Sequence, residues 1–491
     1  MKDCAASVSS KNPDHSASFV ARFQASIYRL TSPAAVIETG ASIDCSLGQS
    51  QDRRPGITHS TIQTPPNSKI PSLLIALSGG VDSVVLLSLA AALRTSSQCA
   101  VRAIYIDHGL QHQSAQWGDF CSSFCASLDV EFASVAVTVD LQSGLSPEAA
   151  ARDVRYDALC EQLQPGEYLC TAHHADDQAE TLLLQLFRGA GVSGLASMPE
   201  LRKFGEGYLL RPLLHCSRAD ILRYASDYAL HWCEDPSNTD LNYDRNYLRN
   251  ELLPSVAQRW PQVLSNISRS ASHCAETMEL LRNLAELDLV DTGADSGAGS
   301  GMHTGADASA AGSLPLSVVH LKTLSEARKK NLLRYWIGHH GFQNPSANQL
   351  QQILNDLVST DDEGAQGRIN FGAAQIARYQ EALFIAERDS FEPLADFEYH
   401  WEDTSVPLVI PELNWRLDVS SQQNLKAYAG QPLRVRNRRG GERWRPDPAG
   451  HSFSVKSLLQ QRRIPPWQRS RIVLVFCDDK LVDICGPGFI L

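Results

Sequence analysis

Two adjacent glycines between two apolar runs constrain this chain more than any other feature. The run at residues 73–77 (LLIAL) precedes them and the run at 84–87 (VVLL) follows, which predicts a buried strand, a tight turn and a helix start. Glycines let successive backbone N–H groups point into one concavity, and the helix N-terminus adds the positive end of its dipole. Such a turn suits a phosphate chain. The residues that form it are Ser78, Gly79, Gly80, Val81, Asp82 and Ser83.

This turn lacks the Gly-Lys-Ser/Thr ending of the usual nucleotide P-loop, so it does not indicate γ-phosphoryl transfer. It resembles the pyrophosphate loop of N-type ATP pyrophosphatases, which adenylate a substrate oxygen and release pyrophosphate. The resemblance implies that ATP binds to these six residues. The plain alternative is a strand–helix turn that holds no ligand.

The length of 491 residues predicts two to four domains, and 43% hydrophobic with 20% charged residues is typical of a soluble globular protein. No apolar run approaches the roughly 18 residues that cross a bilayer. Arg22 and Arg29 interrupt the apolar stretch near the N-terminus, so we expect no secretory signal, no membrane contact and a cytoplasmic location.

The twelve cysteines show no C-x-x-C spacing. Cys121 and Cys125 are four residues apart and would share one helix face, as a metal or redox pair could. Buried thiols in a reducing compartment are the favoured interpretation, because scattered cysteines behave as small hydrophobic side chains.

The net charge of −11 hides a strong asymmetry. Residues 434–471 hold ten Arg and one Lys against Glu442 and Asp447, a balance of +9 that leaves −20 on the rest of the chain. A phosphate backbone meets a local basic patch, not the average charge of the protein, so this segment is a candidate nucleic-acid surface. Trp444 and Trp467 lie among these arginines and could stack on bases, although core packing is the favoured role for both.

Residues 71–250 alternate strand-like and helix-like segments, which predicts an α/β domain with a parallel sheet covered on both faces. Ligands of such sheets bind at the carboxyl ends of the strands. The glycine turn, residues 107–109 and residues 173–174 all fall at such ends. The predicted strands are 73–77, 101–107, 132–139 and 168–172, and the predicted helices 148–160 and 177–187.

The other segments differ from this domain in composition. Residues 1–70 are rich in Ser, Thr, Gln and Pro and are expected to be a flexible extension with one short helix at 19–30, or the product of a mis-assigned start codon. Further domains are expected as follows: a linking helix at 251–290, with helical apolar spacing over 264–289; a low-complexity linker at 291–313; a mainly helical domain at 314–390, strand-like near 367–385; and a small basic α+β domain at 395–491.

An acidic helix start follows the fourth predicted strand, in the segment HHADDQAET at 173–181. His174 and Asp177 share one helical face, with Glu180 beside it. Because Mg²⁺ takes one or two carboxylates together with phosphates, Asp177 is a candidate magnesium ligand beside the phosphates of ATP. Zinc is disfavoured, since the spacing is not His-Glu-x-x-His and a third ligand is missing. Helix capping by the acids is the alternative.

Arg152 is a second candidate phosphate contact, since its guanidinium can clamp two phosphate oxygens. A surface salt bridge to Glu148, four residues earlier on the same predicted helix, is the alternative.

Nine segments, in this order along the chain, resemble the bacterial tRNA(Ile)-lysidine synthase family in its longer form. The resemblance runs from about residue 71 to the end, and the N-terminal extension and the linker lie outside the motifs. The segments are SGGVDS (78–83), IDHGL (106–110), EAAAR (148–152), TAHHADDQAETLLLQLFRGAGVSGL (171–195), RPLL (211–214), EDPSN (234–238), YDRNYLRNELLP (243–254), GGERWRP (440–446) and SLLQQRRIPPWQRSR (457–471).

The resemblance implies a PP-loop ATPase domain and a two-step reaction. ATP adenylates the C2 oxygen of the wobble cytidine in a tRNA(Ile) with a CAU anticodon, and the ε-amine of L-lysine then displaces AMP to give lysidine. A homodimer is compatible with this reading. The catalytic residues implied are Asp82, Arg152, His174, Asp177 and Glu180. Asp82 and Asp177 would position either Mg²⁺ or the lysine ammonium, and Glu180 is another candidate for lysine binding. Arg152 and His174 would neutralise charge on the α-phosphate and the adenylate. The tRNA contacts implied are Arg245, Arg249, Arg438, Arg439, Arg443, Arg462 and Arg463.

Three other readings compete. A tRNA 2-thiocytidine synthase shares the glycine turn, but its chemistry calls for paired cysteines, and this chain has no C-x-x-C. Amidotransferase-coupled synthetases of GMP or NAD have no use for the basic C-terminal segment. A non-catalytic RNA-binding protein with a decayed nucleotide fold is disfavoured by the intact segments at 78–83 and 173–181.

Overall fold

A computed structural model describes the chain in two compact units, Met1–Glu279 and Leu280–Leu491. The described residues are 13–32, 72–97, 99–109, 113–140, 147–295, 315–360, 367–445 and 451–487. Most of the predicted linker at 291–313 lies outside them. Among these residues we find no helix whose length and hydropathy would let it cross a membrane.

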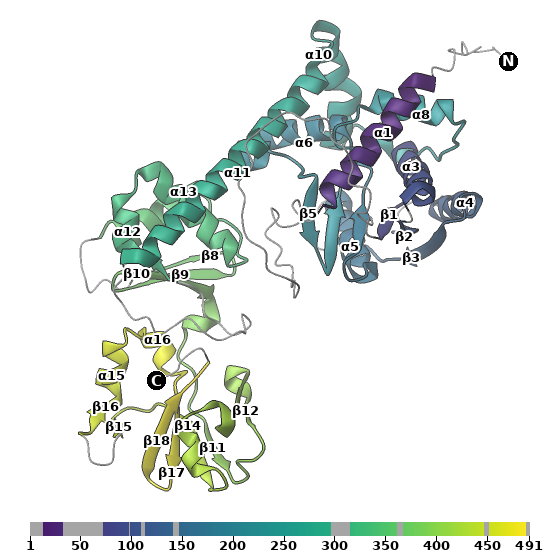
Figure 1. The fold of residues 1–491 in the computed structure, drawn as a ribbon. Coiled ribbons are helices and arrows are strands. Elements are labelled where there is room, and N and C mark those ends of the chain that lie inside the picture. Colours follow the sequence, from purple (N-terminus) through teal and green to yellow (C-terminus); the bar gives the residue numbers. More distant parts are fainter. Residues whose placement is uncertain are drawn as a thin grey trace, which may run out of the picture. The chain divides into compact units, whose positions relative to one another are not determined.

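A six-stranded sheet forms the centre of the first unit, in the order β3-β2-β1-β4-β6-β5 (Figure 1). All neighbouring pairs are parallel except the hairpin of β5 and β6. The predicted α/β fold is therefore confirmed, whereas the hairpin was not predicted. The strands are β1 (Leu73–Ala76), β2 (Val101–Asp107), β3 (Glu131–Ala136), β4 (Tyr168–Cys170), β5 (Leu201–Phe204) and β6 (Gly207–Leu210).

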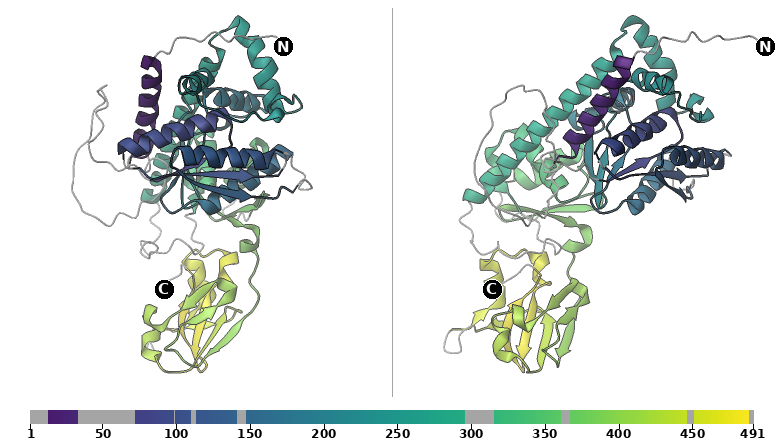
Figure 2. Two further views of the ribbon diagram at one scale, coloured as in Figure 1. Left: turned by 90° about the vertical axis from the view of Figure 1, so that its right-hand side faces the viewer. Right: turned by 45° about the vertical axis from the view of Figure 1, so that its right-hand side comes forward.

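Helices cover both faces of this sheet (Figure 2). Leu73 and Ile75 pack into one core together with α3 (Val81–Ser97) and α4 (Ser114–Ser127). Leu74, whose side chain points the other way along the same strand, packs into a second core. The second core includes residues of α5 (Pro147–Gln162), and the first also includes residues of α8 (Arg218–Asp227).

The N-terminal helix α1 (Pro13–Leu30) also belongs to the first core. Phe19, Phe23 and Ile27 recur every four residues and are at most 1% exposed. The Phe19 ring lies 5.5 Å from the Tyr224 ring of α8. The predicted short helix is therefore confirmed, and the expectation of a flexible extension is corrected for residues 13–32, because this apolar stripe packs on the sheet domain. Residues 33–71 lie outside the described part.

The remaining helices lie between or after the later strands of the sheet in the sequence. α6 (Ala175–Phe187) follows β4, and α7 (Val192–Leu195) precedes the hairpin. α9 (Asp244–Tyr247), a π-helical turn (Leu248–Leu252) and α10 (Leu253–Arg259) precede the long α11 (Val263–Asp295). The long helix predicted over 264–289 is confirmed.

The second unit begins with helices packed on a small antiparallel sheet, ordered β7-β10-β9-β8. Trp336 and Ile337 of α13 are buried in this core. The elements are β7 (Leu316–Ser317), α12 (Val318–Thr323), α13 (Glu326–His339), α14 (Ala347–Ile353), β8 (Arg368–Phe371), β9 (Ala374–Tyr379) and β10 (Ala382–Glu387).

A second antiparallel sheet, β11-β14-β17-β18, lies in the C-terminal part of this unit. Trp467 of α16 is 6% exposed and packs against Tyr379 and Phe391. It is therefore a core residue, as favoured from the sequence. The elements are β11 (Glu398–Trp401), β12 (Leu408–Ile410), β13 (Trp415–Leu417), β14 (Leu433–Asn437), β15 (Arg443–Trp444), β16 (Phe453–Ser454), α15 (Val455–Gln461), α16 (Pro466–Arg469), β17 (Val473–Cys477) and β18 (Lys480–Cys485).

Candidate active site

The glycine turn between β1 and α3 is held in shape by its own polar groups. The hydroxyl of Ser83 donates to the carbonyl of Gly80 at 2.9 Å and accepts from the backbone N–H of Ser78 at 3.1 Å. Gly79 has φ +84°, and a Cβ there would lie 3.4 Å from the Cys121 Sγ. Position 79 therefore requires glycine. A Cβ on Gly80 would meet only the Ser78 hydroxyl, at 3.7 Å among the described atoms, so a side chain there is free to enter the ligand space.

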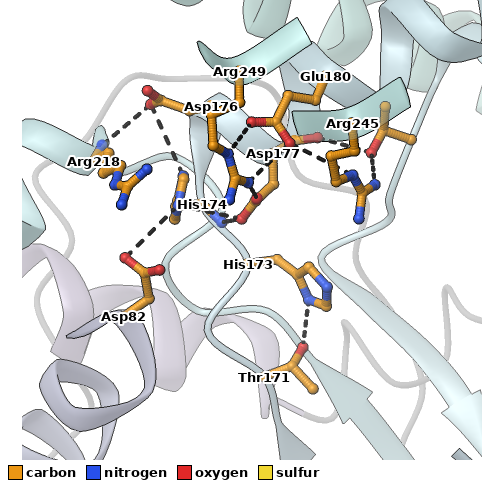
Figure 3. Close-up of polar contacts among 11 residues, drawn as sticks. Asp82, Thr171, His173, His174, Asp176, Asp177, Glu180, Arg218, Arg245 and Arg249 are labelled. Atoms are coloured by element: carbon orange, nitrogen blue, oxygen red, sulfur yellow. Dashed lines mark hydrogen bonds and ion pairs between the residues drawn. The ribbon is translucent and has the colours of Figure 1, made fainter. Parts of the chain in front are cut away.

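His174 joins the turn to the acidic helix start (Figure 3). It lies between β4 and α6, and its Nε2 is 3.8 Å from Asp82 Oδ1 and 3.4 Å from Asp177 Oδ2. The backbone N–H of His174 also donates to Asp177 Oδ2 at 3.0 Å. The carboxylates of Asp82 and Asp177, 95 residues apart in the sequence, are thus both close to the imidazole of His174, at the carboxyl edge of the sheet.

The two carboxylates differ in their proton affinity. Burial raises the pKa of Asp82, while for Asp177 the nearby His174, His173 and Arg249 outweigh burial and lower the pKa. Asp82 Oδ1 is buried without a hydrogen-bond partner among the described residues.

Together these two carboxylates fit Mg²⁺, which accepts one or two carboxylates and takes its other ligands from phosphates and water. The described residues hold no cluster of three or more His, Cys, Asp or Glu side chains that could bind a metal ion without ligands from phosphate or water.

Glu180, on the next turn of α6, forms a buried ion pair with Arg249. The Arg249 Nε donates to Glu180 Oε1 at 2.7 Å, and its Nη2 donates to Glu180 Oε2 at 2.9 Å and to Asp177 Oδ1 at 2.8 Å. Glu180 is 1% exposed, and burial raises its pKa despite the guanidinium. Arg245 Nε lies 3.5 Å from Glu180 Oε2.

Arg245 and Arg249 were expected to contact tRNA. The structure places both on the carboxylates of α6, so it favours a role for them within the site. The sequence held a signal for this arrangement. Arg245 and Arg249 are four residues apart, Asp177 and Glu180 are three apart, and each pair therefore lies on one helical face.

His173 and Arg152 lie beside this group. The His173 Nδ1 is 2.9 Å from the Thr171 hydroxyl, and burial lowers the pKa of His173. The guanidinium of Arg152 lies 5.1 Å from the centre of the Tyr156 ring. The salt bridge considered with Glu148 falls outside the described side chains.

Sequence reasoning missed Arg218, whose backbone N–H donates to Asp176 Oδ1 at 3.2 Å. Its charge opposes the rise that burial causes in the pKa of Asp82. Its position at the start of α8 gave no signal, because α8 meets α6 only through the fold.

The basic residues of the second unit differ in how many hydrogen bonds and ion pairs they form within the protein. Glu442 accepts from the backbone N–H of Arg439 at 2.8 Å and lies 3.9 Å from Arg438 Nε, and Arg439 Nη2 lies 3.0 Å from Glu398. Arg443 Nε donates to the Ser452 hydroxyl at 2.9 Å. Glu442 is already counted in the +9 of the segment, but Glu398 lies outside it, so the charge available to a ligand is smaller than +9.

Arg462 and Arg463 are exposed, and their side chains make no hydrogen bond or ion pair with other described residues. Of the five arginines expected to bind tRNA in this unit, these two present the freest charge.

Family models match three parts of the chain. A PP-loop domain matches residues 57–256, a TilS substrate binding domain matches 316–384, and a TilS substrate C-terminal domain matches 433–489. Among solved structures, the U34-tRNA thiolase NcsA from Methanococcus maripaludis aligns over 42% of this chain and 72% of its own, at 18% identity and a TM-score of 0.37. The NMN synthetase from Francisella tularensis aligns over 41% and 86%, at 15% identity and a TM-score of 0.26.

Curated relatives extend the match over most of the chain. The tRNA(Ile)-lysidine synthase of Coxiella burnetii is 38% identical over 84% of this chain and 88% of its own length. Those of Methylococcus capsulatus and Nitrosomonas europaea are 37% and 36% identical, over 85% of this chain and 91% and 87% of their own. The chain belongs to the tRNA(Ile)-lysidine synthase family.

Proposed function

We propose that this chain is a tRNA(Ile)-lysidine synthase, a ligase that forms a C–N bond and converts ATP to AMP and diphosphate. Its polynucleotide substrate is a tRNA(Ile) with a CAU anticodon, and its second substrate is L-lysine. One observation carries the proposal: the pyrophosphate turn, the Asp82–His174–Asp177 group and the buried Glu180 all converge on one sheet edge. Family membership favours this reading over a tRNA thiolase.

In the first step, the C2 oxygen of the wobble cytidine attacks the α-phosphate of ATP, and pyrophosphate leaves. The backbone N–H groups of the turn and the dipole of α3 would hold the departing pyrophosphate. Asp82 and Asp177 would hold Mg²⁺, which neutralises phosphate charge when bound. His174 would orient both carboxylates from between them. The charge of Arg152 acts on the neighbouring His173.

In the second step, the lysine ε-nitrogen forms a bond to C2, and the C2–O bond breaks with the oxygen leaving on AMP. The amine must lose a proton first, because an ammonium group has no free electron pair. Glu180 suits this task, since burial raises its pKa and makes it a better proton acceptor. Asp177 and Glu180 together offer the carboxylate oxygens that would bind the incoming ammonium.

A wobble base must leave its stack to reach this edge, which costs a few kcal/mol. Contacts made elsewhere on the tRNA would supply that free energy. Arg462 and Arg463 suit phosphate contacts, because their charges are exposed and unpaired among the described residues. A cytoplasmic location follows from the substrates, and a homodimer remains our proposal for the assembly, to be measured by light scattering.

The test is incubation of the protein with ATP, labelled L-lysine and tRNA(Ile) transcribed in vitro, with the label scored in the RNA. We expect label in this tRNA and lysine-dependent release of AMP. A tRNA(Met) transcript, which carries the same anticodon, is the matched control. Incorporation of sulfur without lysine would support the thiolase instead.

A further inference from the structure

Four arginines surround one tyrosine at the edge of the sheet domain. Arg152 and Arg155 come from α5, Arg202 from β5 and Arg211 from the segment after β6. The guanidinium groups of Arg152, Arg155 and Arg202 lie 5.1, 5.6 and 5.8 Å from the centre of the Tyr156 ring. Arg211 lies close enough to Tyr156, Arg202 and Arg152 for these groups to affect its pKa.

This arginine cluster carries more positive charge than its described surroundings neutralise. Arg152, Arg202 and Arg211 form no ion pair with any described carboxylate. Arg211 is 3% exposed, its Nη1 donates to the Pro199 carbonyl at 2.6 Å, and its Nε has no hydrogen-bond partner in the described part. Burial, with the charges of Arg202 and Arg152, lowers the pKa of Arg211 to about 10. Stacking on Tyr156 attracts these cations to the ring but cancels no charge.

We propose that the arginine cluster binds a phosphate of the tRNA backbone near the target nucleotide, an inference that rests on the proposed function. Guanidinium groups match phosphate oxygens with two parallel hydrogen bonds, and several converging arginines are typical of phosphate recognition. Phosphate contacts fix the position of a nucleic acid without reading its sequence. A phosphate held here would set the register with which the anticodon loop enters the site.

The strand order separates this phosphate from those of ATP. β5 lies three strand positions from β1, which at about 4.8 Å per strand is on the order of 14 Å. The α-phosphate of ATP is bonded to the pyrophosphate, so it would lie beside the turn after β1 that would hold the pyrophosphate. Arg202 is exposed on the outermost strand, where a polymer can reach it.

The arginine cluster is nevertheless adjacent to the chemistry. The charges of Arg211, Arg152 and Arg155 act on His173, the neighbour of His174. A polymer that crosses β5 would therefore pass directly toward the catalytic edge.

The experiment compares Arg202→Ala with Lys203→Ala. Both side chains are exposed cations, but successive residues of a strand point to opposite faces, and Lys203 lies over Tyr208, 5.0 Å from its ring centre. We expect Arg202→Ala to weaken filter binding of the tRNA about tenfold and to reduce the salt slope by about one unit. Lys203→Ala should bind like wild type, and Arg202→Lys should restore part of the affinity.

Equal binding by the Arg202→Ala and Lys203→Ala variants would overturn the inference. A rise in the KM for ATP with unchanged tRNA binding would also overturn it, by assigning the arginine cluster to the nucleotide. Filter binding needs no turnover, so it is independent of the proposed reaction. A wild-type protein that binds tRNA(Ile) in this way but forms no lysidine would contradict the proposed function and leave the phosphate site standing.

Discussion

The guanidinium of Arg249 makes two hydrogen bonds to the carboxylate of Glu180, from Nε at 2.7 Å and from Nη2 at 2.9 Å. The same Nη2 reaches Asp177 at 2.8 Å. A cation of the chain itself therefore occupies the carboxylates that we propose for the ammonium of lysine. The charge of Arg249 favours the ionised form of both carboxylates in a buried site, and an incoming lysine must share them with Arg249 or replace it.

Arg249→Ala should therefore destabilise the protein in a pH-dependent manner. Without the guanidinium, the pKa of buried Glu180 rises further above its unfolded value, so stability is retained below the unfolded pKa and lost as the pH rises. Loss of one partner of a buried pair typically costs about 3–5 kcal/mol when the other stays charged. Thermal unfolding at pH 5 and pH 8 measures this, with a larger loss expected at pH 8.

Arg245→Ala is the comparison variant, because it removes a cation 3.5 Å from Glu180 but leaves both hydrogen bonds between Arg249 and Glu180 in place, so a smaller loss of the same sign is expected. The same loss of stability at both pH values for Arg249→Ala would mean that Glu180 is not the group concerned.

The two glycines of the turn should respond differently to substitution. Gly80→Val should fold normally, because a Cβ at this position meets only the Ser78 hydroxyl, at 3.7 Å, among the described atoms. It should lose AMP formation, because its added bulk would enter the space proposed for the phosphates. Gly79→Ala should instead lose about 1–2 kcal/mol of stability, since φ at 79 is left-handed. Denaturant unfolding and AMP release, measured side by side, separate the two effects. Turnover by Gly80→Val at the wild-type rate would remove the turn from the mechanism.

The N-terminal helix should contribute to global stability. Phe19→Ala empties a fully buried position against Tyr224, and such truncations cost about 3–5 kcal/mol. Ser18→Ala changes an exposed neighbour on the same helix and should be close to neutral. If both variants unfold like wild type, α1 does not belong to the cooperative core.

Much of the first unit could be predicted from local pattern, whereas its long-range pairs could not. The buried runs at 73–77 and 101–107 specify β1 and β2 because each is short, apolar and followed by a turn. The hairpin at 201–210 was not predicted, because its two strands have only four residues each, with Gly205 in the turn and Gly207 at the start of β6. Motif spacing identified Asp82 and Asp177, but their meeting on His174 depends on strand order.

The hydrogen bond between Arg249 and Glu180 spans 69 residues. Local spacing places each of the two pairs, Arg245 with Arg249 and Asp177 with Glu180, on one helical face, but it does not report that the two faces meet. The contacts of Arg202 and Arg211 with Tyr156 were not predicted either, because Tyr156 lies on α5 and only the fold brings these residues together. The packing of α1 was partly visible in the four-residue spacing of Phe19, Phe23 and Ile27, but the polar composition around it suggested an unpacked extension.

In the second unit, Arg462→Glu should weaken tRNA binding and flatten its salt dependence by about one unit of slope. Reversal of Arg438 and Arg439 is a poorer test, because both already lie beside carboxylates. Lys426→Glu, an equal charge change at another exposed position of the unit, is the control and should bind normally. Filter binding across a salt series makes the comparison. Equal slopes for all variants would mean that this surface does not contact the tRNA.

The most direct measurement is incorporation of labelled lysine into tRNA(Ile) by the wild-type protein and by Asp177→Asn. Asp177 contacts His174 and Arg249 and belongs to the proposed magnesium and lysine sites, so Asp177→Asn should incorporate at least about a hundredfold less lysine. Since asparagine has nearly the same shape as aspartate, the variant should fold and melt near the wild-type temperature. Wild-type incorporation by Asp177→Asn, with unchanged thermal stability, would reduce Asp177 to a helix cap and contradict the account of the site.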